Sequence, residues 1–265
     1  MIEEKDINHI IEGHSETEEK KDHYHGIHHI TASGTHDDVT DEDFSIKRAY
    51  QFRNRRELIF KIAASGVFLA LALIFTWLDS LLEDSLEALF GGIKVPIRIL
   101  DFLVLVLASP VIGPLFGCII AFLLPWIHGM IIDPDHFWFQ TMIDSFVYPV
   151  MIFIIWFFYY VVFKNSNYHK ETNKHIDFLK RIFPQFFIII IGTILFTLGT
   201  VISMWAMNGF QDSKAQDGSL NQFLDGKNWH LLVLLVAEFI RFSICSIAIF
   251  FIEPKTRIIN HHFAY

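Results

Sequence analysis

The chain has 265 residues, of which 52% are hydrophobic and 15% aromatic, and its formal net charge is −8 at pH 7. A composition this apolar, with a mean hydropathy of +0.39, excludes an ordinary water-soluble domain and indicates an integral membrane protein. The net charge misleads if it is read globally, because 13 of the 29 acidic residues lie between Glu3 and Asp43.

Residues 1–50 are predicted to form a disordered cytoplasmic tail, because they are rich in Glu, Asp and His and show no apolar periodicity. Such a segment cannot bury enough surface to offset the conformational entropy it would lose on folding. It also lacks the basic start, apolar stretch and small-residue cleavage site of a secretory signal peptide.

Residues 51–265 are predicted to form an all-α polytopic membrane domain with six transmembrane helices. The second apolar segment is too short to cross a hydrocarbon layer as a straight helix, so we expect it to be tilted, half-inserted or sheltered by its neighbours. Gly113 and Pro114 mark the turn into the third. The six segments lie at about 58–79, 96–108, 111–132, 142–163, 184–207 and 230–252.

The distribution of Lys and Arg predicts that both termini are cytoplasmic, because short loops rich in these residues stay on that side of a membrane. Basic residues gather before the first segment, after the fourth and after the sixth, whereas the alternate loops are poor in them. The basic residues are Lys47, Arg48, Arg53, Arg55 and Arg56, then Lys164, Lys170, Lys174, Lys180 and Arg181, then Lys255 and Arg257.

Two charges, Glu238 and Arg241, stand in the apolar run from about Trp229 to Ile252. Ionisable groups inside a span are expensive unless they face a cavity or a partner. Their spacing of three residues places them on one helix face. They could form an internal ion pair that only packs between helices, but we favour a solute pocket that offers one acceptor and one planar donor.

Other polar and aromatic residues near the predicted outer ends of the spans are candidates for the same solute site. For Arg98 and Asp101, a place at the membrane interface is an equally good interpretation. Trp77 fits an interfacial aromatic belt at least as well as a ligand contact. The further candidates are Trp77, Asp79, Arg98, Asp101 and Asn208.

Small residues recur in the first segment at three- and four-residue spacing: Ala63, Gly66 and Ala70. They make a smooth strip that another helix can approach closely. Such strips are common in internal packing, so the partner helix is open at this point.

Together these features resemble the substrate-binding (S) component of energy-coupling factor vitamin transporters, over about residues 58–257. The resemblance rests on six spans, the strip in the first of them, the stretch Ile97–Asp101 before Gly113–Gly117, and the polar pair in Ala237–Arg241. Riboflavin-type members look like Leu-Lys-Leu-Asp before Gly-Pro-x-x-Gly, with Phe-Asn-x-x-Lys in the last helix. Glu238 and Arg241 depart from that last motif in residue type but keep its spacing.

The resemblance implies a subunit of the bacterial plasma membrane that captures a water-soluble vitamin or related metabolite at the outer face. It implies partners as well: a membrane coupling subunit, approached through Ala63, Gly66 and Ala70, and two cytoplasmic ATPase subunits. The chain has no G-x-x-x-x-G-K-[ST] motif of its own for nucleotide phosphates. We expect no enzymatic activity, cofactor, bound metal or nucleic-acid partner.

Two alternative functions stay open. His23, His25, His28 and His29 lie close together in the tail and would suit zinc, copper or nickel, as in a divalent metal-ion transporter subunit. His230 with Glu238 and Arg241 could serve an intramembrane enzyme, although neither H-E-x-x-H nor a nucleophile elbow is present.

Overall fold

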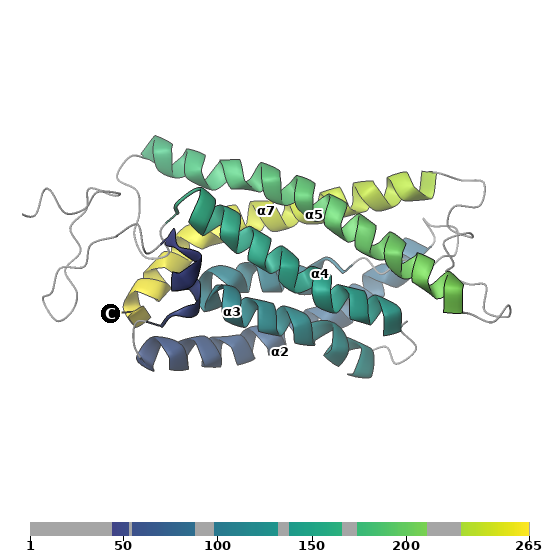
Figure 1. Cartoon of the computed structure of the whole chain (residues 1–265), viewed down its shortest axis with the longest axis horizontal. Coiled ribbons are helices and arrows are strands. Elements are labelled where there is room, and N and C mark those ends of the chain that lie inside the picture. Colours follow the sequence, from purple (N-terminus) through teal and green to yellow (C-terminus); the bar gives the residue numbers. More distant parts are fainter. Residues whose placement is uncertain are drawn as a thin grey trace, which may run out of the picture.

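A computed structural model of the chain describes residues 44–52, 55–87, 98–131, 138–165, 174–210 and 229–264. Within these ranges every regular element is a helix, which confirms the predicted all-α class (Figure 1). The elements are the 3₁₀ turn η2 (Ile46–Tyr50), α2 (Arg55–Glu87), α3 (Leu100–Ile131), α4 (Trp138–Trp156), the π-helical turn η4 (Phe157–Val162), α5 (Lys174–Phe210) and α7 (Trp229–Ala264).

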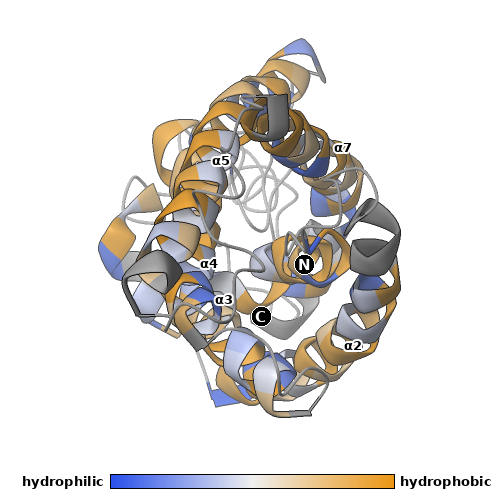
Figure 2. Cartoon of the chain, turned by 90° about the vertical axis from the view of Figure 1, so that its right-hand side faces the viewer, coloured by the Kyte–Doolittle hydropathy of each residue, from blue (hydrophilic) through white to orange (hydrophobic). Residues whose placement is uncertain are grey.

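Five helices in the described part of the chain are long and apolar enough to cross a membrane: α2, α3, α4 continued by η4, α5 and α7. Long helices follow from runs of Leu, Ile, Phe and Val, since only a helix satisfies every backbone hydrogen bond within one apolar segment. Hydrophobic residues colour much of these helices (Figure 2), and each span has a mean hydropathy of 2.0–2.4. The transmembrane character predicted from composition is therefore supported.

The predicted second and third apolar segments both lie in α3, which is broken at Gly113. This residue has φ 77° and ψ 175°, a left-handed conformation that glycine adopts without steric cost. Pro114 has no N–H, so the carbonyl of Pro110 loses its helical donor. The Nδ2 of Asn260 in α7 donates to that carbonyl at 2.7 Å. The turn predicted at Gly113 and Pro114 is confirmed.

The chain reverses direction at this break, so α3 has a first arm (100–112) and a second arm (114–131). A Cβ at Gly113 would lie 3.8 Å from the Nζ of Lys61, near the start of α2. In the second arm, a Cβ at Gly129 would lie 3.4 Å from the Oγ1 of Thr141, near the start of α4. The turn, the start of α2 and the end of α7 thus share one end of the bundle (Figure 1).

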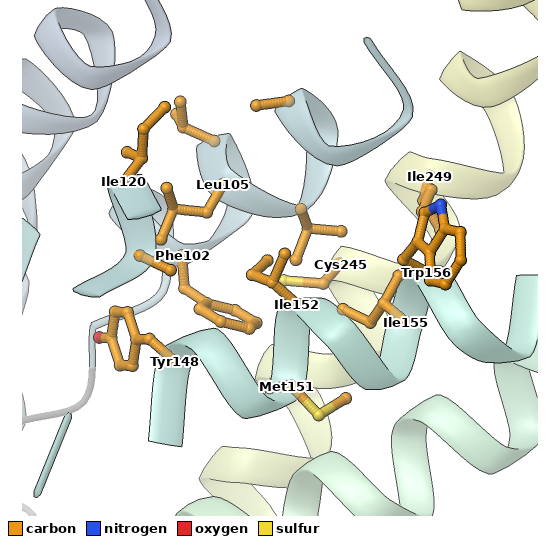
Figure 3. Packing of buried hydrophobic residues seen from close by; sticks show 14 of the residues in the cluster. Phe102, Leu105, Ile120, Tyr148, Met151, Ile152, Ile155, Trp156, Cys245 and Ile249 are labelled. Carbon is orange, nitrogen blue, oxygen red and sulfur yellow. The ribbon is translucent and has the colours of Figure 1, made fainter. Parts of the chain in front are cut away.

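The interior where these helices meet is aromatic and aliphatic. Phe102 in the first arm of α3 packs edge-on against Tyr148 of α4 at 5.1 Å and against Phe242 of α7 at 5.5 Å. Met151 and Cys245 continue the same core and are fully buried (Figure 3). Two helices distant in sequence, α4 and α7, are therefore held together beside the first arm of α3.

The last residues of the range assigned to the tail are part of the folded structure. Phe44 is buried, and η2 packs against α3. Just beyond η2, the ring centroid of Phe52 lies 5.9 Å from that of Phe116 in α3. The histidines of the tail lie outside the described residues.

Candidate functional site

Glu238 and Arg241 form a buried ion pair within α7, as their spacing predicts. The Nη1 of Arg241 lies 3.2 Å from the Oε2 of Glu238, and both residues are 1% exposed. The Nη2 of the same guanidinium donates to the hydroxyl of Tyr148 at 3.2 Å. Arg241 thus ties α7 to α4 in the interior.

Four aromatic rings surround the guanidinium of Arg241. Its Cζ lies 4.4 Å from the ring centroid of Phe196 and 4.9 Å from that of Phe102, with the rings of Tyr148 and Phe242 at 5.7 and 5.8 Å. Aromatic faces attract cations, and they do so more strongly where water is excluded. The rings therefore stabilise a charge that would otherwise be costly in the interior.

Asp79 joins α2 to the start of α3. Its Oδ1 accepts hydrogen bonds from the backbone N–H groups of Ile99 and Leu100, and its Oδ2 accepts from those of Leu100 and Asp101, at 2.8–3.2 Å. The first N–H groups of a helix have no partner within the helix and attract negative charge. The carboxylate of Asp79 supplies the missing acceptor, and its own acceptor sites are filled.

Arg98, Asp101 and Asp144 are buried next to this cap. They are 1%, 0% and 6% exposed, respectively. Arg98 attracts the carboxylates of both Asp101 and Asp144, and Arg241 acts on both as well. The Oδ1 of Asp144 accepts a hydrogen bond from the Nε2 of Gln140 at 2.8 Å.

These six charged residues form one electrostatic network, which we call the buried charge cluster. It draws on α2, α3, α4 and α7, and lies toward the end of the bundle opposite the turn at Gly113. Separated buried charges are costly, and a set of them inside a membrane protein is typical of a functional site. The members are Asp79, Arg98, Asp101, Asp144, Glu238 and Arg241.

Five of the seven predicted solute-site residues belong to this cluster: Asp79, Arg98, Asp101, Glu238 and Arg241. Trp77 does not join them, because its side chain is 57% exposed on the outer surface of α2. That position fits the interfacial interpretation of the residue. Asn208 lies in α5, and its side chain is outside the described residues.

Two residues of the site, Asp144 and Tyr148 from α4, were not predicted from the sequence. Asp144 carried a usable signal, since it is the only charged residue of the apolar segment 142–163. Tyr148 carried none, because a tyrosine in a span fits lipid contact, core packing or a site equally well.

The predicted partner strip lies on the outside of α2. Ala63, Gly66 and Ala70 are exposed, and a Cβ added at Gly66 would meet nothing within 4 Å. In the most apolar stretch of α2, only 6% of the residues are buried within the protein. In the corresponding stretches of the other four helices the buried share is 39–61%. The strip is therefore not used to pack α2 within the described part of this chain.

Metal-binding geometry is absent from the described ranges: no three His, Cys, Asp or Glu side chains there are grouped so that they could hold an ion. The tail histidines His23, His25, His28 and His29 fall outside those ranges. The side chain of His230, invoked for the enzyme alternative, does so too.

Gly192 is predicted to be essential for the packing around Arg241. A Cβ there would lie 2.5 Å from ring atoms of Phe242, which contacts the guanidinium of Arg241. We expect Gly192→Ala to destabilise the protein by about 1–3 kcal/mol, because the ring must move in a filled core. Gly66→Ala is the matched control and should unfold like wild type in detergent. Equal stability of the two variants would contradict this packing.

Comparisons with known proteins give only distant relatives. No family model and no solved structure matches the chain. Uncharacterized protein MG147 of Mycoplasma genitalium is 29% identical over 123 residues, and the uncharacterized MG147 homolog of Mycoplasma pneumoniae is 30% identical over 127 residues. Each match covers 46% of this chain, and the chain spans about 30% of the length of these curated relatives.

Proposed function

We propose that the chain is the solute-binding subunit of an importer of the energy-coupling factor type in a bacterial plasma membrane. It captures a water-soluble vitamin or related metabolite at the outer face, and a membrane coupling subunit with two ATPases drives release inside. The observation that carries this proposal is the buried charge cluster, because a helix bundle held only by packing has no need of six charges in its interior.

The cluster retains hydrogen-bonding capacity that a polar solute would use. The Nε of Arg241 and both carboxyl oxygens of Asp101 have no hydrogen-bond partner within the described residues. Buried polar groups are normally paired, and each unpaired one is costly in a medium of low dielectric constant. A solute with complementary donors and acceptors would recover that free energy, which is a source of both affinity and specificity.

In the proposed topology the two arms of α3 count as separate short segments, so that the chain has six segments and both termini are cytoplasmic. At 1.5 Å per residue, the first arm is about 20 Å long and thus shorter than the hydrocarbon core of about 30 Å. The apolar part of α3 is 61% buried, the highest share of the five helices, so its neighbours shelter it from lipid. The Lys and Arg residues that flank the segments favour the cytoplasm for the end of the bundle that holds the turn at Gly113. The buried charge cluster then lies toward the outside.

The exposed strip on α2 is the proposed docking face for the coupling subunit. We expect Gly66→Leu to abolish co-purification of the coupling and ATPase subunits, because a larger side chain prevents close helix approach. The isolated chain should keep its stability, since the space at Gly66 is open. Val67→Leu, at a neighbouring exposed position, is the control that should leave the complex intact. A complex that survives Gly66→Leu would exclude this face.

The proposal is tested by mass spectrometry of small molecules extracted from the purified chain. A stoichiometric organic metabolite is expected from wild type and not from the variant Glu238→Gln, Arg241→Met, which removes the ion pair but keeps side-chain volume. The control is Asp177→Asn, Arg181→Gln, which removes another ion pair, in α5, with an N–O distance of 2.7 Å. An extract holding only metal, or no bound compound, would contradict the proposal.

A further inference from the structure

Asp101 differs from the other carboxylates of the buried charge cluster. It is 0% exposed, yet neither of its carboxyl oxygens has a hydrogen-bond partner within the described residues. The oxygens of Asp79 cap a helix, Glu238 pairs with Arg241, and Asp144 accepts from Gln140. Asp101 is thus the member that uses the least of its acceptor capacity, with only a weak approach from the backbone N–H of Phe102.

The cluster also carries an excess of negative charge. If Asp79 is set aside because backbone N–H groups surround it, three carboxylates remain against the guanidinium groups of Arg98 and Arg241. The described part of the cluster therefore holds one carboxylate more than it holds guanidinium groups. A buried charge without a counter-charge is strongly unfavourable, so a cation that binds here gains more than it would in water.

The surroundings favour an organic cation over a metal ion. Asp101, Asp144 and Glu238 do not group into a metal-binding arrangement within the described residues. Phe102, which follows Asp101, meets the rings of Tyr148 and Phe196, each at a centroid distance of 5.1 Å. A carboxylate in aromatic surroundings suits a group with N–H donors, because such donors make charge-assisted hydrogen bonds to the carboxylate.

We infer that the solute carries a cationic nitrogen group of the ammonium or amidine type, and that Asp101 accepts the hydrogen bonds of this group. The inference rests on the proposed function and adds the chemical class of the solute. It makes the excess carboxylate the element that selects cationic over anionic metabolites, while Arg98 and Arg241 neutralise the remaining carboxylates.

The test uses three probes of nearly equal shape: benzamidine, which is cationic, benzamide, which is neutral, and benzoate, which is anionic. Thermal unfolding of the full chain in detergent is followed for wild type, Asp101→Asn and the control Asp177→Asn. Benzamidine is expected to raise the Tm of wild type and of the control. Its affinity for Asp101→Asn should fall about tenfold or more, as for the loss of one charge-assisted hydrogen bond.

Asp101→Asn without any probe supplies a second readout. Because it removes one negative charge from a cluster with more carboxylates than guanidinium groups, its Tm should equal or exceed that of wild type, which separates a binding role from a structural one. A larger Tm increase with benzoate than with benzamidine would overturn the inference, and so would equal stabilisation of wild type and Asp101→Asn by benzamidine, or no response to any probe.

Failure of the inference is distinguishable from failure of the proposed function. If wild type retains an organic metabolite that is neutral or anionic, or that Asp101→Asn retains equally well, the solute class is wrong and the binding function stands. If wild type retains no organic metabolite, both are wrong.

Discussion

Arg241→Met is expected to destabilise the protein by about 3–5 kcal/mol, because it leaves a buried carboxylate without its counter-charge. Glu238 is 1% exposed and forms its ion pair with Arg241, and Tyr148 would lose the hydrogen bond from the same guanidinium. The four rings around Arg241 would also lose the cation they face. Equilibrium unfolding in mixed micelles measures the effect.

Two comparisons separate loss of the pair from loss of volume. In the double variant Glu238→Gln, Arg241→Met, much of the lost stability should return, since the carboxylate that lost its counter-charge is then replaced by a neutral side chain. Ser243→Ala, at an exposed position of the same helix, should be close to neutral. Equal instability of the single and double variants would show that the ion pair is not what stabilises this region.

Asp79→Ala is expected to have the second large effect, about 3 kcal/mol or more, because three backbone N–H groups lose their acceptor in the interior. Those groups belong to Ile99, Leu100 and Asp101, at the start of α3. Amide hydrogen exchange should accelerate locally over these residues. The variant should therefore loosen the end of the bundle that holds the charge cluster.

Asp79→Asn provides the graded control for this cap. Its amide keeps one acceptor oxygen but has no charge, so an intermediate loss of stability is expected. Protection of the Leu100 and Asp101 amides that is unchanged in Asp79→Ala would contradict the role of Asp79 as the cap of α3.

The charged residues of the site could be predicted because an ionisable group in an apolar segment is costly and therefore conspicuous. Glu238 and Arg241 were recognised in this way, and their spacing predicted the pair that the structure contains. The break in α3 was predictable for a similar reason, since Gly113 and Pro114 together end a helix.

The remaining parts of the site depend on contacts between distant segments. The bond from Asp79 to the backbone of Leu100 spans 21 residues and has no local sequence signature. In a chain with 28 phenylalanines, nothing marks Phe102, Phe196 and Phe242 as the rings that meet at Arg241 rather than lipid. The outward position of Trp77 depends on how α2 is rotated about its own axis. The apolar pattern of that helix does not determine this rotation, because apolar residues occur on all of its faces.

Native mass spectrometry of the intact chain, released from detergent, tests for a solute bound at the buried charge cluster. One organic adduct per chain is expected in wild type and in the control Asp177→Asn, Arg181→Gln. No adduct is expected in Glu238→Gln, Arg241→Met. A wild-type chain without an adduct, or an adduct that persists when the buried pair in α7 is removed, would contradict a solute site at the buried charge cluster.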